Sequence, residues 1–451
     1  MGSASAPPAH FMEKDNPRIT HGWAMYDWAN SVYPLVITTT VFPIYFNAQA
    51  SAVATGHDPA GRPLVSFFGM EVLATSLLIY AISAAFLIVA AISPLLTALA
   101  DYSGRKKRFM QFFCALGALS CCALYSFTPD TLSPSILFYI LATVGFAGSL
   151  VFYNSYLPEI ASEENVDRLS ARGFSLGYIG STLLLILCLG LIMGASKLGM
   201  EKGHATRLSF LLTGLWWGGF ALIPFSRLPK DTGRPAAAGD EIGSRYLLNG
   251  FRELGKVWRE LRHLTLLRWF LLSYFFACMG VQTVLYVATP FAEETLHMES
   301  DALILTILIL QPLGVAGAVL FSRLSARLGN VKALAAAITV WAAVCAGGYF
   351  VQAGWSFWLL TCNIGMAMGG VQSLSRSTYA KLIPEDTHDT TSFFSFFDVT
   401  EKLGIVIGTA SFSYISQITG SMRNSLLALM VFFALGLGLL GRLWGRPLRT
   451  R

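Results

Sequence analysis

Residues 22–48 read GWAMYDWANSVYPLVITTTVFPIYFNA, and this stretch decides how the chain folds. It is apolar and longer than the ~20 residues that a helix needs to cross a bilayer. It nevertheless carries Asp27 and Asn30 within the apolar run. A carboxylate in hydrocarbon costs at least ~2.5 kcal/mol. We therefore expect a membrane-spanning helix whose acidic face looks into protein or water rather than lipid.

The polar residues of this segment share one side of the predicted helix. Asp27, Ser31, Pro34 and Thr38 recur at helical spacing, and Asn30 lies beside them. A proline removes a backbone hydrogen bond, so we expect a bend near mid-span. One interpretation is a helix that lines a polar cavity. The other is that Asp27 lies at the inner headgroup boundary and is simply hydrated.

Composition places the whole chain in a membrane. Of its 451 residues, 54% are hydrophobic and 13% are charged, about half the charged share of a soluble protein. No cleavable signal is expected, because residues 1–21 are polar and contain no apolar core. The fold class predicted is an all-α membrane protein with twelve transmembrane helices. The apolar spans are 22–48, 70–99, 108–128, 133–157, 172–196, 207–228, 266–292, 301–323, 332–352, 354–380, 392–418 and 424–445.

The positive charges indicate the topology. With the N-terminus placed in the cytoplasm, 26 Lys and Arg residues fall on the cytoplasmic side and five on the outer side. Both termini are therefore expected in the cytoplasm. The net charge of +6 is spread over several loops, so it predicts no nucleic-acid partner. The seven cysteines fall within apolar spans at spacings that match no metal or haem site, so neither a metal nor a cofactor is expected.

The longest polar stretch divides the chain into six spans plus six. We expect a tail (1–21), a first bundle (22–228), a linker (229–265), a second bundle (266–445) and a final tail (446–451). Within the linker, apolar residues at helical spacing predict an amphipathic helix: Leu247, Phe251, Leu254, Trp258 and Leu261. Such a helix can lie on the inner membrane surface, or it can rest on the protein as a connector. The sequence favours neither.

The two halves resemble each other. Gly104 and Gly329 each follow a span and stand 225 positions apart. At the ends of spans four and ten, three residues recur 226 positions apart, namely Tyr153, Pro158 and Glu159 with Tyr379, Pro384 and Glu385. A duplicated six-span unit is the design of many secondary transporters, in which the binding site lies between the halves. We therefore predict two pseudo-symmetric six-helix bundles.

The loop after the second span, residues 100–108, reads ADYSGRKKR. Gly104 permits a tight turn, and Asp101 can face the positive N-terminus of a helix in the other half. Arg105 can pair with a carboxylate there. We predict that these residues and Asp398 form a gate that bridges the halves when the cytoplasmic side is closed. The basic run after Gly104 is also explained by topology alone.

This loop resembles the signature of the major facilitator superfamily, Gly-x-x-x-Asp-Arg-x-Gly-Arg-Arg. Asp101, Gly104, Arg105 and Lys106 match the signature, whereas Thr97 replaces its first glycine and Tyr102 its first arginine. The resemblance extends over nearly the whole chain. It implies alternating access of two halves around a central site, and no enzymatic activity.

The first span carries sequence motifs that are specific to one branch of this superfamily. Tyr-Asp-Trp-Ala-Asn-Ser at 26–31 and Phe-Pro-x-Tyr-Phe at 42–46 are similar to the vacuolar effluxers linked to autophagy in fungi and to their bacterial relatives. This resemblance implies efflux of amino acids or similar metabolites. We expect a monomer among membrane lipids, in a bacterial inner membrane rather than a vacuolar one.

Span eleven is the second charged span. Asp398 and Lys402 are four residues apart with the acid first, the favourable order for a helical ion pair. This pairing leaves Glu401 as an unpaired carboxylate. Three roles stay open for Asp398 and Glu401: a latch that pairs with Arg105, a contact with a proton or the substrate, and a hydrated helix end.

Uncharged polar residues fall in the spans expected to line the cavity. Together with Asn30, we predict as solute contacts Tyr33, Tyr153, Asn154, Gln282, Tyr286 and Asn363, with Lys402 as a charged neighbour. Each one alone is equally explained by helix–helix packing.

The predicted function is secondary active transport of a small polar solute. No phosphate-cradling Gly-Lys-Ser/Thr motif is present in the sequence, so we expect the energy to come from a solute or proton gradient. Asp27 and Glu401 are the predicted ionisable pair. Two alternatives remain: a sensor that kept the fold without turnover, and a membrane-embedded enzyme acting on lipid or sugar carriers. For the enzyme, the acidic loop 159–167 is the nearest candidate, but it lacks histidine.

Overall fold

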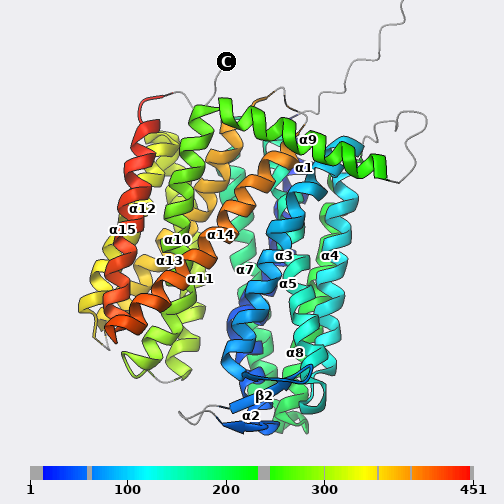
Figure 1. Cartoon of the computed structure of the whole chain (residues 1–451), viewed down its shortest axis with the longest axis vertical. Coiled ribbons are helices and arrows are strands. Elements are labelled where there is room, and N and C mark those ends of the chain that lie inside the picture. Colours follow the sequence, from blue (N-terminus) through cyan, green and yellow to red (C-terminus); the bar gives the residue numbers. More distant parts are fainter. Residues whose placement is uncertain are drawn as a thin grey trace, which may run out of the picture.

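The computed structural model describes residues 14–57, 63–231, 244–298, 300–352, 355–385, 387 and 389–446. Long helices run side by side along the long axis of the molecule, and one helix lies across an end (Figure 1). The described chain is mostly helical, in agreement with the predicted class.

Two groups of helices follow one another along the chain. The N-half contains α1 (Pro17–Asn30), α3 (Ala74–Ser103), α4 (Lys106–Ala123), α5 (Leu132–Ser155), α7 (Val166–Met193) and α8 (Lys202–Arg227). The C-half contains α10 (Thr265–Glu294), α11 (Ser300–Leu328), α12 (Asn330–Phe350), α13 (Trp355–Leu382), α14 (Thr390–Thr419) and α15 (Met422–Leu440). Between the halves, α7 contacts α11 and α13, while α14 contacts α3 and α5.

The chain that crosses first is not one regular helix. After α1 comes a π-helix, η1 (Tyr33–Val41), and then α2 (Phe42–Ala52). Pro34 lies at the start of η1, where its missing N–H interrupts the helical hydrogen bonds. The hydroxyl of Thr40 donates to the Leu35 carbonyl at 2.7 Å. Near mid-span, where a bend is predicted, the chain forms a π-helical segment.

The prediction that the second span begins at residue 70 is wrong. β1 (Gly56–His57), β2 (Pro63–Phe67) and β3 (Met70–Leu73) form an antiparallel sheet in that order, and α3 starts only after β3. Phe68 and Gly69 have φ angles of 47° and 84°, as a two-residue hairpin turn requires. β2 and β3 are largely apolar, and β3 runs directly into α3, so composition alone could not separate them from the helix.

Nine helices in the described part of the chain are long and apolar enough to cross a membrane. The predicted spans outside this set are 22–48, 354–380 and 392–418. The first is divided into three shorter helices. The other two correspond to α13 and α14, which carry Arg376 and Lys402. Each of these three segments carries a charged residue inside the bundle, and the first of them carries Asp27.

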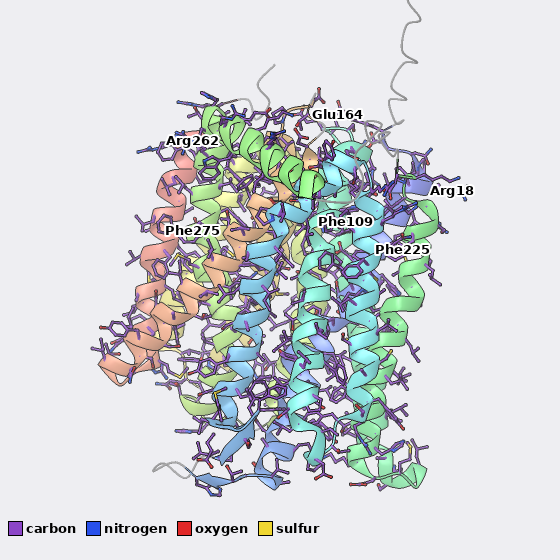
Figure 2. The ribbon with its side chains drawn as sticks, turned by 45° about the vertical axis from the view of Figure 1, so that its right-hand side comes forward. Arg18, Phe109, Glu164, Phe225, Arg262 and Phe275 are labelled. Carbon is purple, nitrogen blue, oxygen red and sulfur yellow. The ribbon has the colours of Figure 1, made fainter. Side chains whose placement is uncertain are left out.

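One end of the bundle carries the loops rich in Lys and Arg, and we call it the basic end. Helix α9 (Ser244–His263) lies across it, and Figure 2 places Glu164 and Arg262 there. At this end α3 and α11 terminate at Gly104 and Gly329, whose φ angles are 62° and 85°. Both glycines thus have a positive φ, which other residues rarely adopt. Gly104 is in the left-handed helical conformation with ψ 29°, whereas Gly329 has ψ 156°, so the two halves place a glycine at the same point but turn differently there.

Helix α9 rests on the protein. Its Val257 and Leu261 are buried, and it contacts α3 of the N-half and α14 of the C-half. Lys256 Nζ lies 2.7 Å from Asp389 Oδ2, just before α14. Of the two interpretations of the linker helix, these contacts support the connector. The predicted apolar positions 247 and 251 lie outside the side chains that the structure describes, as do most of the two predicted tails.

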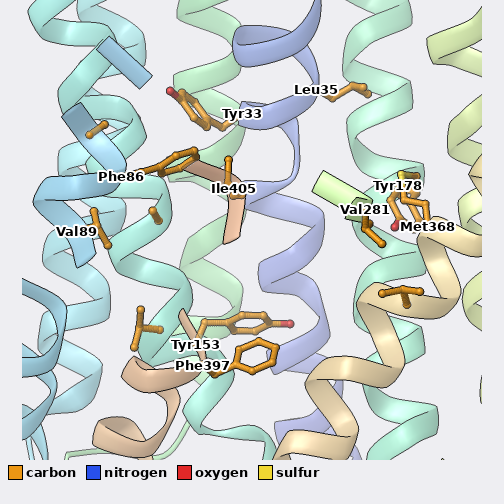
Figure 3. Packing of buried hydrophobic residues seen from close by; sticks show 14 of the residues in the cluster. Tyr33, Leu35, Phe86, Val89, Tyr153, Tyr178, Val281, Met368, Phe397 and Ile405 are labelled. Carbon is orange, nitrogen blue, oxygen red and sulfur yellow. The ribbon is translucent and has the colours of Figure 1, made fainter. Parts of the chain in front are cut away.

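Aromatic and aliphatic side chains from both halves fill the interior. Figure 3 shows Tyr33, Phe86 and Tyr153 of the N-half, with Phe397 and Ile405 of the C-half, among the buried residues. This packing holds the charged side chains described next away from lipid.

Candidate functional site

A buried ion pair joins the two halves. Arg376 of α13 lies against Asp27 of α1, with its Nη1 at 3.1 Å and its Nη2 at 3.2 Å from Asp27 Oδ2. The two side chains are only 4% and 5% exposed. The interpretation of Asp27 as a hydrated residue at the headgroup boundary is therefore wrong. Buried charges persist in proteins when they are paired and hydrogen-bonded, and both conditions are met here.

Side chains of α5 and α7 complete the hydrogen bonding of this pair. The Tyr153 hydroxyl donates to Asp27 Oδ2 at 2.9 Å. Arg376 donates through Nε to the Ser170 hydroxyl at 3.0 Å and through Nη2 to the Ser170 carbonyl at 2.8 Å. Its Nη1 also lies 3.3 Å from Asn154 Oδ1. We call Asp27, Tyr153, Asn154, Ser170 and Arg376 the inter-half cluster.

Aromatic rings and a glycine shape the inter-half cluster. The guanidinium carbon of Arg376 lies 4.8 Å from the Trp23 ring centroid and 4.1 Å from that of Phe174, within the range of cation–π attraction. On α7, a Cβ atom at Gly173 would overlap Asp27 Oδ2 and stand 3.0 Å from Arg376 Nη2. The ion pair therefore lies directly against the backbone of α7.

A second charged group lies within the C-half. On α14, Lys402 Nζ is 2.8 Å from Asp398 Oδ1 and 3.6 Å from Glu401 Oε2. Gln282 Nε2 of α10 donates to Glu401 Oε1 at 2.9 Å. The predicted ion pair between Asp398 and Lys402 is confirmed. Glu401 is not the unpaired acid that was expected, because Gln282 and Lys402 both reach it. We call Gln282, Asp398, Glu401 and Lys402 the α14 cluster.

The two halves also meet at the ends of α3 and α14. The backbone N and the hydroxyl of Ser392 both lie 2.7 Å from Asp101 Oδ2. Ser392 is in the first turn of α14, where backbone N–H groups lack helical partners and the helix dipole favours a negative charge. The structure thus places Asp101 at a helix start of the other half, where the sequence predicted it.

A matching contact on the other side of the molecule was not predicted. Asp167, in the first turn of α7, accepts hydrogen bonds from the Ser325 hydroxyl at 3.0 Å and from Asn330 Nδ2 at 2.7 Å. Lys381 Nζ lies 2.7 Å from the same carboxylate. In the sequence Asp167 belongs to an acidic loop, whereas in the structure it is a buried contact between the halves.

The predicted pairing of Arg105 with a carboxylate of α14 is wrong. The Arg105 side chain is exposed, whereas Asp398 and Glu401 lie deeper along α14, in the α14 cluster. Asp398 is eight residues into that helix, or ~12 Å from its start, which places it far from the loop. The neighbouring Lys106 instead forms an ion pair with Glu159.

Three other predicted contacts form no hydrogen bond with either cluster among the described residues, whereas a fourth, Tyr286, lies beside the α14 cluster. The Tyr33 hydroxyl lies 2.6 Å from Thr143 Oγ1 inside the N-half. Asn363 Nδ2 donates to a carbonyl of its own helix, that of Leu359, at 2.8 Å. Asn30 is buried, and its Nδ2 has no hydrogen-bond partner among the described residues. Tyr286 is half-buried on α10, one turn beyond Gln282 of the α14 cluster.

Arg376, the partner of Asp27, is not among the predicted site residues. Arg376 lies four residues before the predicted end of its span and was counted with the cytoplasmic loop charges. The signal that could have found it is the need of a buried Asp27 for a cation, because Arg376 is one of two cations that lie at least four residues inside both ends of a predicted span. The other is Lys402, and it is satisfied by Asp398 on its own helix.

Comparison with known proteins agrees with this architecture. Residues 15–444 match the family described as "Vacuole effluxer Atg22 like". The chain is 30% identical to the uncharacterized MFS-type transporter YxiO of Bacillus subtilis (strain 168) over 430 residues, which cover 93% of each chain. It is 25% identical to autophagy-related protein 22-1 of Emericella nidulans, covering 91% of this chain and 87% of that one.

A solved structure shares the fold. The human organic anion transporter MFSD10 superimposes with a TM-score of 0.71 at 15% identity, covering 95% of this chain and all of that one. At this identity the likeness concerns the fold alone. The sequence relatives are transporters rather than enzymes, and the protein is a multi-pass integral membrane protein. The chain therefore belongs to the Atg22-like effluxer family, a branch of the major facilitator superfamily.

Proposed function

We propose that this protein is a secondary active transporter that moves a small zwitterionic solute, such as an amino acid, by alternating access. The observation that carries the proposal is the ion pair of Asp27 and Arg376, because its two members belong to different halves. If residues 22–228 and 266–445 rock against each other, this buried pair must separate. Separation leaves a carboxylate and a guanidinium without partners, which is costly in a medium of low dielectric.

A zwitterion offsets this cost on both sides. Its carboxylate can replace Asp27 against the two-pronged guanidinium of Arg376, the geometry that arginine recognises best. Its ammonium can replace Arg376 against Asp27 and Tyr153. A ligand shifts a conformational equilibrium only by its differential affinity for the two states. A solute that carries both charges has that differential affinity, whereas a neutral sugar or a simple anion satisfies only one partner or neither.

The contacts at the basic end support a state that is closed on that side. Asp101 with Ser392 and Asp167 with Ser325 each join a helix end of one half to a helix start of the other. We propose that they act as the gate, together with the turn at Gly104, and that the basic end faces the cytoplasm of a bacterial cell. The transporter works as a monomer and exports its solute, driven by a solute or proton gradient.

The test is transport by purified protein in liposomes loaded with a panel of radiolabelled amino acids, sugars and organic anions, with and without a pH difference. Wild type is expected to move zwitterionic amino acids. Asp27→Asn and Arg376→Gln are each expected to abolish that movement, while Glu293→Gln, at an exposed helix end, serves as the matched control. Unimpaired amino-acid transport by both cluster variants would remove the ion pair from the mechanism. A sensor without turnover would show no flux of any solute.

A further inference from the structure

We propose that the α14 cluster is the site that binds the coupling proton, and that it takes up one proton because it carries one carboxylate more than it has cations. The inference rests on the proposed transport function. It assigns the proton to Asp398 and Glu401, away from the inter-half cluster that we propose for the solute.

A count of charges distinguishes the α14 cluster from the other buried charges. In the inter-half cluster, Asp27 and Arg376 sum to zero. Asp167 and Lys381 also sum to zero. Asp398, Glu401 and Lys402 sum to one negative charge. A net charge held inside a membrane-spanning bundle is costly, and one bound proton removes it.

One oxygen of the α14 cluster has no donor. Asp398 is buried, and its Oδ1 accepts from Lys402. Its Oδ2 is buried and has no hydrogen-bond partner in the part of the chain that the structure describes. A buried carboxylate oxygen without a donor is destabilised while it is ionised. This oxygen is independent evidence that the cluster is short of one proton.

Glu401 connects the cluster to the interior of the bundle. Its side chain is 25% exposed, whereas those of Asp398 and Lys402 are 7% and 6% exposed. Along α14 the exposed apolar residues recur at helical spacing and mark the lipid-facing side: Leu403, Ile407, Tyr414 and Ile418. Glu401 is two residues before Leu403, which places it ~200° around the helix from that side. The exposed part of Glu401 therefore faces away from lipid.

The titratable groups around the α14 cluster do not change its net charge, so the proton must bind to one of the two carboxylates. Tyr274, Cys278 and Tyr286 of α10 are the titratable residues that interact with it. On the opposite side, Lys402 Nζ lies 5.6 Å from the ring centroid of Phe86 on α3, in the N-half. Phenols and thiols are neutral at physiological pH, so they do not supply the missing positive charge. The contact with Phe86 places the cluster beside the junction of the halves.

The position of the cluster suggests how a proton could affect the gate. Ser392, which binds Asp101 of the N-half, lies in the first turn of the same helix, nine residues before Glu401. Protonation changes the attraction of Lys402 for its two carboxylates. Any resulting shift of α14 reaches the Asp101 contact directly, because both lie on one continuous helix.

The experiment varies the net charge of the cluster and measures accumulation of a mixture of radiolabelled amino acids in liposomes driven by a pH difference. Glu401→Gln and Asp398→Asn each bring the net charge of the α14 cluster to zero. Both are expected to lower pH-driven accumulation at least tenfold, while exchange of labelled for unlabelled amino acid, which needs no net proton movement, remains measurable. Asp398→Asn combined with Lys402→Gln restores one negative charge on Glu401, and pH-driven accumulation is expected to return. Glu293→Gln is the matched control.

A second readout does not depend on transport. Infrared difference spectra between alkaline and acidic buffer report the C=O stretch of a carboxyl group that gains a proton. The wild-type spectrum is expected to lose one such band in Glu401→Gln and in Asp398→Asn, and to keep it in the double variant. Undiminished pH-driven accumulation in both single variants, or unchanged infrared spectra in both, overturns the assignment of the proton. Absence of amino-acid transport by wild type contradicts the proposed function instead.

Discussion

The Ser325 hydroxyl at the end of α11 donates to Asp167 Oδ2 at the start of α7, at 3.0 Å. This contact is the counterpart, in the duplicated chain, of the contact between Asp101 and Ser392. Asp167 and Ser392 stand 225 positions apart, the same offset that relates Gly104 to Gly329. The two contacts differ in which helix carries the carboxylate. Asp101 lies near the end of α3, whereas Asp167 lies at the start of α7. At the contact of Asp167, a lysine, Lys381, also forms an ion pair with the carboxylate.

Removing one partner of that buried pair is predicted to be more harmful than removing both charges. Lys381→Met leaves the Asp167 charge uncompensated, and such a loss typically lowers the stability of the folded protein by ~3–5 kcal/mol. Asp167→Asn with Lys381→Met leaves an amide that Ser325 can still bind. The apparent melting temperature, followed with a thiol-reactive dye that reports exposure of buried cysteines such as Cys121, is expected to fall further for the single variant. If the single variant melts at the same temperature as the double variant, the unpaired charge of Asp167 is not destabilising and the prediction is wrong.

Arg376→Lys is predicted to impair transport although it conserves the charge. Arg376 makes hydrogen bonds to Asp27, Ser170 and Asn154 from three different nitrogen atoms. A lysine has a single nitrogen and cannot reproduce this fork. Loss of about 1.4 kcal/mol of solute binding corresponds to a tenfold loss of apparent affinity, measured as KM in liposomes. Arg18→Lys, at an exposed position, is the control, and equal KM values for the two variants would contradict the role of the guanidinium geometry.

Gly173→Ala is predicted to displace the ion pair. A methyl group there would overlap Asp27 Oδ2, and overpacking of this kind typically costs ~1–3 kcal/mol. Both the melting temperature and the transport rate are expected to fall. The matched control is Gly219→Ala in α8, because a Cβ atom at Gly219 meets no atom within 4 Å. If the two alanine variants have the same melting temperature and transport rate, the close approach of α7 to Asp27 is not important for stability or transport.

Asp15 is predicted to hold the loop before α7 in a pH-dependent manner. Partial burial opposes its ionisation, but hydrogen bonds from the side chain and backbone of Ser162 and from Asn165 outweigh burial and lower the pKa of Asp15 below its ordinary 3.8. The contact therefore stabilises the folded protein fully at pH values above 3.8, the ordinary pKa of the carboxyl group. This stabilisation is lost as the pH falls through the lowered pKa of Asp15 in the folded protein.

Hydrogen exchange of the Ser162 amide measures this contact. Wild type is expected to be protected relative to Asp15→Ala at neutral pH, and the difference is expected to vanish in strongly acidic buffer. A difference that persists unchanged below the pKa of Asp15 would show that ionisation of this carboxylate is irrelevant to the loop. Asp130→Ala, at the opposite end of the bundle, is the control.

Much of the fold could be predicted because its signals are local. Apolar runs, the basic loops and the Gly104 turn depend on nearby residues and on the bilayer, and each was found. The ion pair of Asp398 and Lys402 was also predictable, since four residues on one helix bring side chains together. The strands β2 and β3 were missed because they are largely apolar and β3 continues directly into α3, with Glu71 as the one charged residue in these two strands.

By itself, the sequence determined that the chain is helical, that it spans a membrane, that it is duplicated, and that Asp27 needs a shielded environment. Only the tertiary structure decided the partner of Asp27. Arg376 is 349 positions away, and the packing of α1, α7 and α13 selects it over other cations. The cost of an unpaired charge demands a partner but does not say which one, because that choice depends on which helices become neighbours.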